Sequence, residues 1–291
     1  MKIIRCEAEL ENYGRCQLDG EYVSGSTYLK ESGECFVLGV NCECKFYPYD
    51  YARFFKRYSS LVITAEIENT HKILAQYIKS PFWVGPSFAE STMDIASKNQ
   101  ALLIKTDNDC KFIFALANEN FQTTIRRGQK NNQIEICVNA VAPDIAKLCG
   151  AALILSNDKN PYIAVKKAFD LAEKDGLINT KLKKQKAYPK SLEYLGWCTW
   201  NAFYHNVSES GIIEKMEEFK AKNIPVRWVL IDDGWSEVNE DMTLKSIYED
   251  KNKFPNGLKG IIDILKQKYG IVSVGVWHAA TGYWRGMGFK N

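Results

Sequence analysis

The sequence predicts an N-terminal all-β sandwich followed by an incomplete parallel (β/α)8 TIM barrel. Up to about residue 156, short apolar runs alternate with turns rich in Gly, Asn and Asp, which is typical of an antiparallel sandwich. After residue 192, strand and helix patterns alternate, and this βαβ order is typical of a parallel sheet. The predicted domains are residues 1–180, a sandwich with a linker helix, and residues 191–291, joined by a solvated linker at 181–190.

Seven strands and one helix are expected in the first domain. The strands are short runs of β-branched and aromatic residues bounded by turn residues: Ile3–Ala8, Cys35–Val40, Leu61–Glu68, Ala101–Thr106, Lys111–Ala117, Gln133–Val138 and Ala151–Leu155. Pro161–Lys174 has an apolar face and a proline at an early position, which predicts a helix with Gly176 as its stop.

The second domain is expected to hold three strands separated by two helices. The strands are Leu195–Trp200, Val226–Ile231 and Ile271–Val276. Ser208 and Asn256 are predicted to cap the helices between them, and Gly270 is predicted to end the second helix. Residues 191–291 hold about three βα units, whereas a barrel needs upwards of about 200 residues. Three parallel strands cannot close a barrel, so we expect an open parallel edge whose unpaired backbone groups would invite aggregation.

The composition argues against several classes of protein. A formal net charge of +3 without a basic stripe argues against nucleic-acid binding. Nine cysteines without Cys-x-x-Cys spacing and three widely separated histidines argue against a zinc site, and no other cofactor is indicated. No apolar stretch approaches the length of a membrane span, and the N-terminus becomes charged before a signal-peptide core could form. A cytoplasmic protein with reduced thiols is expected.

The most informative motif is the pair Asp232-Asp233 directly after the buried strand Val226–Ile231. Successive side chains alternate in a strand, so two adjacent carboxylates cannot both point into a core and must leave the strand at its end. A polar turn is the simplest alternative, and a metal-binding pair would need further ligands that the sequence does not identify. A P-loop nucleotidase is excluded because no Gly-Lys pair occurs in the chain.

Aromatic and polar residues follow each of the three predicted parallel strands. Parallel α/β folds build their sites at the carboxyl ends of strands, where carboxylates accept hydroxyl hydrogen bonds and indoles cover apolar sugar faces. These residues therefore predict a site for a neutral polyhydroxyl ligand. The candidate substrate-binding residues are Trp200, Asn201, Asp232, Asp233, Trp235, Trp277 and His278.

Three motifs resemble those of the raffinose synthase and seed imbibition protein branch of glycoside hydrolase family 36, whose relatives are α-galactosidases. The motifs are Gly196-Trp197-Cys198-Thr199-Trp200-Asn201-Ala202-Phe203-Tyr204, Ile231-Asp232-Asp233-Gly234-Trp235 and Val276-Trp277-His278-Ala279-Ala280-Thr281-Gly282-Tyr283-Trp284. Their order agrees with the family. Weaker similarity extends upstream through Phe82-Trp83 and Asn160-Pro161-Tyr162.

The resemblance implies a β-sandwich followed by a catalytic barrel, and a retaining mechanism with a carboxylate nucleophile and a carboxylic acid/base. It assigns galactose hydroxyls to Asp232 and Asp233, and the walls of the pocket to Trp200, Trp235 and Trp277. Asn201 stands where the branch usually has an acidic residue. The resemblance places both catalytic carboxylates beyond residue 291, so no catalytic residue is expected in this chain.

The expected function is therefore that of an α-galactosidase or a raffinose-type galactosyltransferase, present as an N-terminal portion and acting on a galactose-containing oligosaccharide. Two alternatives stay open. The chain could be a non-catalytic carbohydrate-binding protein, or one subunit of a split enzyme whose barrel a second chain completes.

Overall fold

The computed structural model describes residues 1–10, 14–17, 23–44, 60–67, 70–80, 83–141, 147–279 and 282–288. The chain forms two compact units, Met1–Gln185 and Lys186–Asn291. Within the described ranges, no helix is long and apolar enough to cross a membrane.

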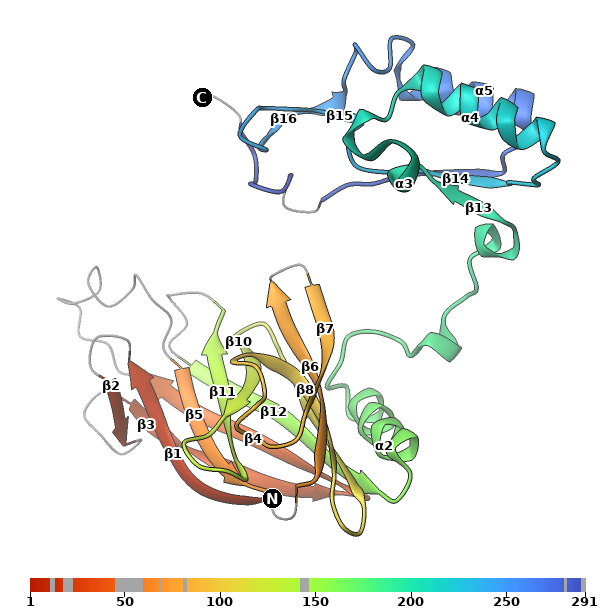
Figure 1. The fold of residues 1–291 in the computed structure, drawn as a ribbon. Helices are drawn as coiled ribbons and strands as arrows, with labels where there is room; N and C mark the ends of the chain where they lie inside the picture. The colour runs from red at the N-terminus through yellow and green to blue at the C-terminus, as the bar shows by residue number, and fades with distance from the viewer. Residues whose placement is uncertain are drawn as a thin grey trace. The chain divides into compact units, whose positions relative to one another are not determined.

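The described strands of the first unit form one antiparallel sheet (Figure 1). They are β1 (Lys2–Leu10), β2 (Gly14–Gln17), β3 (Val23–Ser32), β4 (Cys35–Cys44), β5 (Ser60–Glu66), β6 (Lys72–Ser80), β7 (Trp83–Ala89), β8 (Asn99–Lys105), β9 (Cys110–Ala115), β10 (Phe121–Arg127), β11 (Gln133–Ala140) and β12 (Lys147–Asp158). Their order is β2-β1-β5-β11-β10-β8-β9-β12-β4-β3, and β6 pairs with both β7 and β8.

The all-β character of the first unit is confirmed, but its strands do not form two separate stacked sheets. Leu38 of β4 and Ile63 of β5 are both fully buried in one core, although their strands lie far apart in the strand order. The sheet therefore curves into a nearly closed, barrel-like form. One part of the sheet runs from β2 to β10 in the strand order, and the other part runs from β8 to β3. The two parts meet between β10 and β8, where Ile125 and Asn99 are the one pair in register among the described residues. The buried Asn99 side chain donates a hydrogen bond of 2.9 Å to the Ile125 carbonyl and reinforces this narrow junction.

Each of the seven expected strands coincides with a strand of the sheet, although Glu68 lies outside the described residues. The sequence did not indicate β2, β3, β6, β7 and β10. The β7 strand, for example, contains Gly85 and Pro86, which argue against a central strand but are tolerated at an edge. Among the described strands, β7 pairs only with β6. No described strand on its other edge therefore needs a hydrogen bond from Pro86, which has no N–H.

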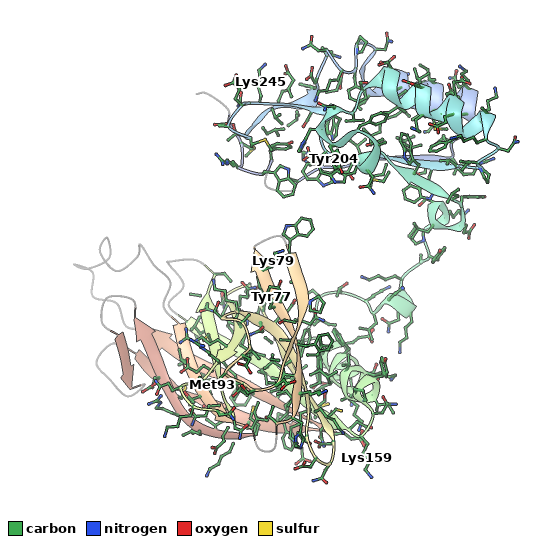
Figure 2. All side chains as sticks on the ribbon, in the orientation of Figure 1. Tyr77, Lys79, Met93, Lys159, Tyr204 and Lys245 are labelled. Carbon is green, nitrogen blue, oxygen red and sulfur yellow. The ribbon has the colours of Figure 1, made fainter. Side chains whose placement is uncertain are left out.

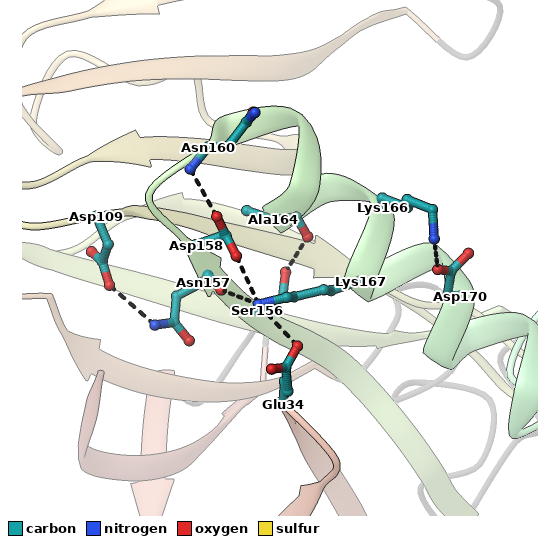
Figure 3. A network of polar contacts seen from close by, with 10 residues as sticks. All are labelled: Glu34, Asp109, Ser156, Asn157, Asp158, Asn160, Ala164, Lys166, Lys167 and Asp170. Atoms are coloured by element: carbon teal, nitrogen blue, oxygen red, sulfur yellow. Dashed lines mark hydrogen bonds and ion pairs between the residues drawn. The ribbon is translucent and has the colours of Figure 1, made fainter.

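Helix α2 spans Pro161–Lys174, as the sequence predicts, and packs against β9 and β12. Its N-cap is Asn160, whose side chain accepts a hydrogen bond of 2.9 Å from the Tyr162 N–H. Lys167 projects back from the helix to the strands, where it pairs with Asp158 at 2.8 Å and with Glu34 at 3.0 Å (Figure 3).

The second unit contains a three-stranded parallel sheet in the order β13-β14-β17. Its strands are β13 (Gly196–Cys198), β14 (Trp228–Ile231) and β17 (Ser273–Val276). The helices are α3 (Trp200–Phe203), α4 (Glu209–Ala221) and α5 (Gly257–Tyr269), and an antiparallel hairpin joins β15 (Ser236–Val238) to β16 (Leu244–Glu249). Short 3₁₀ turns are η1 (Lys183–Gln185), η2 (Lys190–Glu193) and η3 (Tyr204–Asn206). Strand and helix alternate as predicted, except that the β15–β16 hairpin, which the sequence did not indicate, lies between β14 and α5. Closure into a barrel stays a prediction.

The helix ends follow the sequence signals in part. The Ser208 hydroxyl caps α4 by accepting a hydrogen bond of 3.2 Å from the Gly211 N–H, and Gly270 ends α5 in the left-handed conformation. The prediction that the Asn256 side chain caps α5 is wrong. Its amide nitrogen instead donates a hydrogen bond of 2.7 Å to the buried carboxylate of Glu209, and its side-chain oxygen accepts none from the N–H groups of α5.

Candidate functional site

The carboxyl ends of the three parallel strands lie at one edge of the second sheet. The Thr199 N–H donates to the Leu230 carbonyl at 3.0 Å, and the Trp277 N–H donates to the Ile231 carbonyl at 2.8 Å. Backbone hydrogen bonds thus continue one residue past β13 and β17. They bring together the segments that follow β13, β14 and β17, as the sequence predicts for side chains at the ends of parallel strands.

Asp232 is half-buried and is held by groups from β13 and its following residue. Its N–H donates to the Thr199 hydroxyl at 2.9 Å, and the Cys198 thiol lies 2.9 Å from its Oδ2. The Asp233 N–H donates to Oδ1 at 2.7 Å. The contacts with Cys198 and with the Asp233 N–H fix the carboxylate in orientation, and its remaining lone pairs can accept hydrogen bonds from a ligand.

The Cys198 thiol acts as a donor in this arrangement. Burial raises its pKa above the ordinary value, and the hydrogen bond to the Asp232 carboxylate raises this pKa further. The thiol therefore keeps its proton at neutral pH and can donate a hydrogen bond to Asp232.

Asp233 is in a different environment, with 2% of its surface exposed. Its Oδ1 accepts a hydrogen bond of 2.6 Å from the Tyr283 hydroxyl, and its Oδ2 accepts one of 2.7 Å from the Trp284 indole. The His205 Nε2 lies 3.2 Å from the same Oδ2. Both oxygens of this buried carboxylate are therefore engaged by side chains of the protein.

Aromatic side chains from two segments meet at Asp233, through Trp284 after β17 and through His205 after β13. Trp277 and Trp284 are stacked, with ring centroids 5.8 Å apart and an interplanar angle of 24°. Trp200 meets His205 edge-on at 5.1 Å. Tyr204, labelled in Figure 2, packs edge-on against Trp200 at 5.3 Å. Stacked and edge-on contacts of this kind are the favoured geometries of aromatic pairs and hold the rings in place.

The remaining predicted binding residues are Trp235, Asn201 and His278, and their environments differ. Trp235 is buried, with 7% of its surface exposed, and its indole N–H donates to the Trp277 carbonyl at 2.7 Å. It supports Trp277 from the core. Asn201 and His278 are exposed, and their side chains form no hydrogen bond or ion pair with the described part of the chain.

The turn after β14 is pressed tightly against the segment after β13. Gly234 has a φ of +108°, and a Cβ at this position would lie 2.5 Å from the His205 carbonyl oxygen. The ammonium group of Lys253 donates to the carbonyls of both His205 and Gly234, each at 2.8 Å. The glycine permits this close approach and the lysine secures it.

Sequence reasoning found the aspartate pair and the tryptophans of the strand ends, but assigned no role to Cys198, Thr199, His205, Tyr283 or Trp284. All except His205 fall within the three motifs quoted above, so their positions carried a signal. Among the described residues, no group of three or more His, Cys, Asp or Glu side chains is arranged to hold a metal ion.

Comparison with known proteins agrees with this architecture. A family model for raffinose synthase or seed imbibition protein Sip1 matches residues 56–254. The chain is 28% identical over 243 residues to a probable galactinol–sucrose galactosyltransferase 6 of Arabidopsis thaliana, covering 71% of this chain and 32% of that protein. It is 30% identical over 210 residues to a galactinol–sucrose galactosyltransferase of Pisum sativum, covering 60% of this chain and 26% of that protein.

The fold is similar to that of a GH36 α-galactosidase, AgaA of Geobacillus stearothermophilus, with a TM-score of 0.50 and 11% identity. That match covers 95% of this chain and 46% of the α-galactosidase. This likeness is one of fold. The family model matches more than half of the chain, and the chain therefore belongs to the raffinose synthase or seed imbibition protein Sip1 family. It spans less than a third of the length of the two curated relatives.

Proposed function

We propose that this chain supplies the galactosyl-recognition part of an α-galactoside-active enzyme. Asp232 carries the proposal, because its half-buried carboxylate is held at the end of β14, next to Asp233, which is hydrogen-bonded to the indole of Trp284 after β17 and to His205 after β13. A fixed carboxylate beside indole faces suits a sugar, which offers hydroxyl donors on its edge and C–H groups on its faces. Galactose is the proposed sugar because the two curated relatives are named as galactosyltransferases.

The proposed reaction is transfer of a galactosyl group to an acceptor sugar, and hydrolysis of an α-galactoside is the second candidate. Transfer is preferred because both relatives are named for transfer from galactinol to sucrose, whereas the likeness to an α-galactosidase concerns the fold. In a retaining mechanism the galactosyl group passes through a covalent intermediate on a carboxylate, and the acceptor then decides between transfer and hydrolysis.

We also propose that residues 191–291 form the first part of a (β/α)8 barrel, joined to the β domain (residues 1–180) by the linker at 181–190. Three parallel strands with α4 and α5 between them support this proposal. The nucleophile and the acid/base are proposed to lie on further barrel strands, either in the same protein or in a second chain. A binding protein without catalytic carboxylates is the alternative from a different functional class.

The proposal is tested by titrating the chain with galactose and raffinose, with glucose as the comparison sugar, in a calorimeter. Galactose and raffinose should bind, and Asp232→Asn should weaken their binding about tenfold or more, as expected when a hydrogen bond to a charged group is lost. Asp263→Asn, at an exposed position of α5 where Asp263 pairs with Lys259, is the matched control and should bind as the wild type does. Equal affinity for galactose in the Asp232→Asn variant would overturn the proposed role of Asp232.

An aryl α-galactoside separates recognition from catalysis. We expect the chain on its own to bind this compound without releasing the aryl group, because its nucleophile is proposed to lie elsewhere. A stoichiometric burst of aryl release would place a nucleophile within these residues. Turnover restored by adding a second chain with further βα units would support the split enzyme.

A further inference from the structure

The turn after β13 contains a residue in a strained backbone conformation. Tyr204 has a φ of +48° and a ψ of −135°. Glycine enters this region freely, but a residue with a Cβ rarely adopts it, so the conformation costs free energy. Tyr204 is 57% exposed, and burial of its ring therefore offsets little of that cost. Contacts made by its neighbours in the chain must hold the strained turn.

The ammonium group of Lys253 holds the main chain directly after Tyr204. It donates hydrogen bonds of 2.8 Å to the His205 carbonyl and of 2.8 Å to the Gly234 carbonyl. An ammonium offers three donors and no acceptor, and hydrogen bonds from a charged donor are stronger than those between neutral groups. One cation thus ties the turn after β13 to the turn after β14.

Lys253 is itself fixed through its main chain. Its N–H donates to the Asp250 carbonyl at 3.1 Å, and its carbonyl accepts a hydrogen bond of 2.9 Å from the Glu209 N–H at the start of α4. The Asp250 N–H donates in turn to the Trp235 carbonyl at 2.9 Å. The segment from Asp250 to Lys253 is therefore anchored both at α4 and at the turn after β14, and the ammonium group extends from a fixed backbone.

The strained turn carries two members of a group of three aromatic side chains. Tyr204 and His205 both meet the ring of Trp200 edge-on, with ring centroids 5.3 and 5.1 Å away. The Tyr204 N–H also donates to the Trp200 carbonyl, so main chain and rings are held together. Because Lys253 fixes the His205 carbonyl, the directions in which the Tyr204 and His205 side chains leave the chain depend on this cation.

We infer that Lys253 is a positioning residue of the candidate site. Its ammonium group holds the strained turn at Tyr204 and so fixes the arrangement of Trp200, Tyr204 and His205. A contact between these rings and a sugar rests on the proposed function, but the hold of Lys253 on the turn does not. Without the cation, the turn relaxes out of the strained conformation and the three rings lose their arrangement.

The first experiment needs no ligand and compares two lysines of the same segment. Lys253→Met keeps the length of the side chain and removes the donor, and the change should shift the NMR resonances of the Trp200 indole and the His205 imidazole. Lys251→Met, which removes an exposed partner of Glu249, should leave both in place. Unchanged Trp200 and His205 resonances in Lys253→Met would overturn the inference.

A second experiment tests whether Lys253 imposes the strain. Glycine tolerates the backbone of Tyr204 and alanine does not, so Tyr204→Gly should unfold at a higher urea concentration than Tyr204→Ala. In the Lys253→Met background the turn can relax, and the difference between the two midpoints should shrink by about half or more. In the Lys251→Met background it should persist. A difference of equal size in both backgrounds would show that the cation does not hold the strained turn.

A measurement on the unmodified chain covers the case in which Lys253→Met does not fold. Proton exchange of lysine ammonium groups is followed by ¹⁵N NMR. The Lys253 ammonium, which donates to two carbonyls, should exchange at least about tenfold more slowly than that of Lys266, an exposed residue of α5. Equal exchange rates would show that Lys253 does not hold these carbonyls and would overturn the inference.

Titration with raffinose separates this inference from the proposed function. Lys253→Met should weaken binding about fivefold, because the rings are displaced while the carboxylates remain, and Lys251→Met should bind as the wild type does. Undiminished binding in a Lys253→Met variant whose rings have moved would overturn the role of Lys253 in the site. If the wild type binds no galactoside, the proposed function fails, and the NMR and urea experiments still decide whether Lys253 holds the turn.

Discussion

The Cys198 thiol lies 2.9 Å from Oδ2 of Asp232 and donates a hydrogen bond to it across the ends of two parallel strands, β13 and β14. The relationship couples two groups that the sequence places 34 positions apart. Because the thiol donates a hydrogen bond to the carboxylate, the negative charge of Asp232 raises the pKa of Cys198. This coupling leads to the first prediction.

Asp232→Asn should lower the pKa of the Cys198 thiol. Burial and the Asp232 carboxylate both raise this pKa, and the substitution removes the negative charge while leaving the burial. At a given alkaline pH, a larger fraction of Cys198 will then be thiolate and will react faster with iodoacetamide. The pH profile of alkylation, followed by mass spectrometry of the Cys198 peptide, should shift to lower pH. An unshifted profile, matching that of Asp263→Asn, would contradict the hydrogen bond.

Gly234→Ala should destabilise the second unit by about 3 kcal/mol, because the added methyl meets the His205 main chain and the residue has a positive φ. Gly286→Ala is the matched control. Its φ is +88° and nothing lies within 4 Å of the added Cβ, so it should lose only about 1 kcal/mol from backbone strain. Urea unfolding followed by tryptophan fluorescence measures both losses. Equal losses would show that the contact with His205 can relax.

Asp109→Asn should destabilise the first unit at neutral pH and have little effect in acid. Burial by itself raises the pKa of Asp109, but hydrogen bonds from Thr106, Lys111 and Asn157 outweigh it, so the net pKa lies below the ordinary value of 3.8 (Figure 3 shows the contact with Asn157). A lowered pKa contributes stability above the ordinary value, and that contribution is lost as the pH falls through the lowered value.

The measurement for Asp109 is the free energy of unfolding of wild type and variant at pH 7 and at pH 3. The difference should be about 1 kcal/mol at pH 7 and should shrink at pH 3. Asp170→Asn, which removes an exposed partner of Lys166, serves as the control and should show a smaller effect at both pH values. A loss for Asp109→Asn that is larger in acid would reverse the assigned direction of the pKa shift.

Glu209→Ala should reduce the stability of the second unit by about 1–3 kcal/mol, because it leaves the Asn256 amide without its acceptor. The Glu209 carboxylate is 6% exposed and accepts hydrogen bonds of 2.7 and 3.3 Å from the Asn256 side chain and N–H. Glu214→Ala, at an exposed position of the same helix, is the control. In the double variant Glu209→Ala/Asn256→Ala, the loss of unfolding free energy should be smaller than the sum of the two single losses, since both changes break the same contact. Full additivity would rule out this pairing.

Local sequence patterns were sufficient to predict several elements of the fold. The apolar stripe and the proline of Pro161–Lys174 predicted α2, and Ser208 predicted the start of α4. The continuous apolar run Val226–Ile231 predicted a strand, which the structure narrows to Trp228–Ile231; Val229 and Ile231 are buried, and Trp228 and Leu230 are half-buried. In each case the signal lies within the element itself. Edge strands such as β3 and β7 were missed because their polar, glycine and proline residues resemble loops, and only pairing with a neighbour makes them strands.

The candidate site shows the same limit at the level of single side chains. The motif at Asp232 and Asp233 could be predicted because carboxylates after a buried strand are conspicuous. Their different environments could not, because the donors that surround Asp233 lie 50 and 51 positions later, at Tyr283 and Trp284. Trp235 likewise resembled a rim residue, and only the packing of the core shows that its ring is buried.

The hydrogen bond from the Trp235 indole to the Trp277 carbonyl links the interior of the second unit to the proposed sugar site. A substitution that alters the volume around Trp235 should shift the backbone that carries Trp277. If the proposed function holds, interior positions that no ligand touches would then tune sugar affinity.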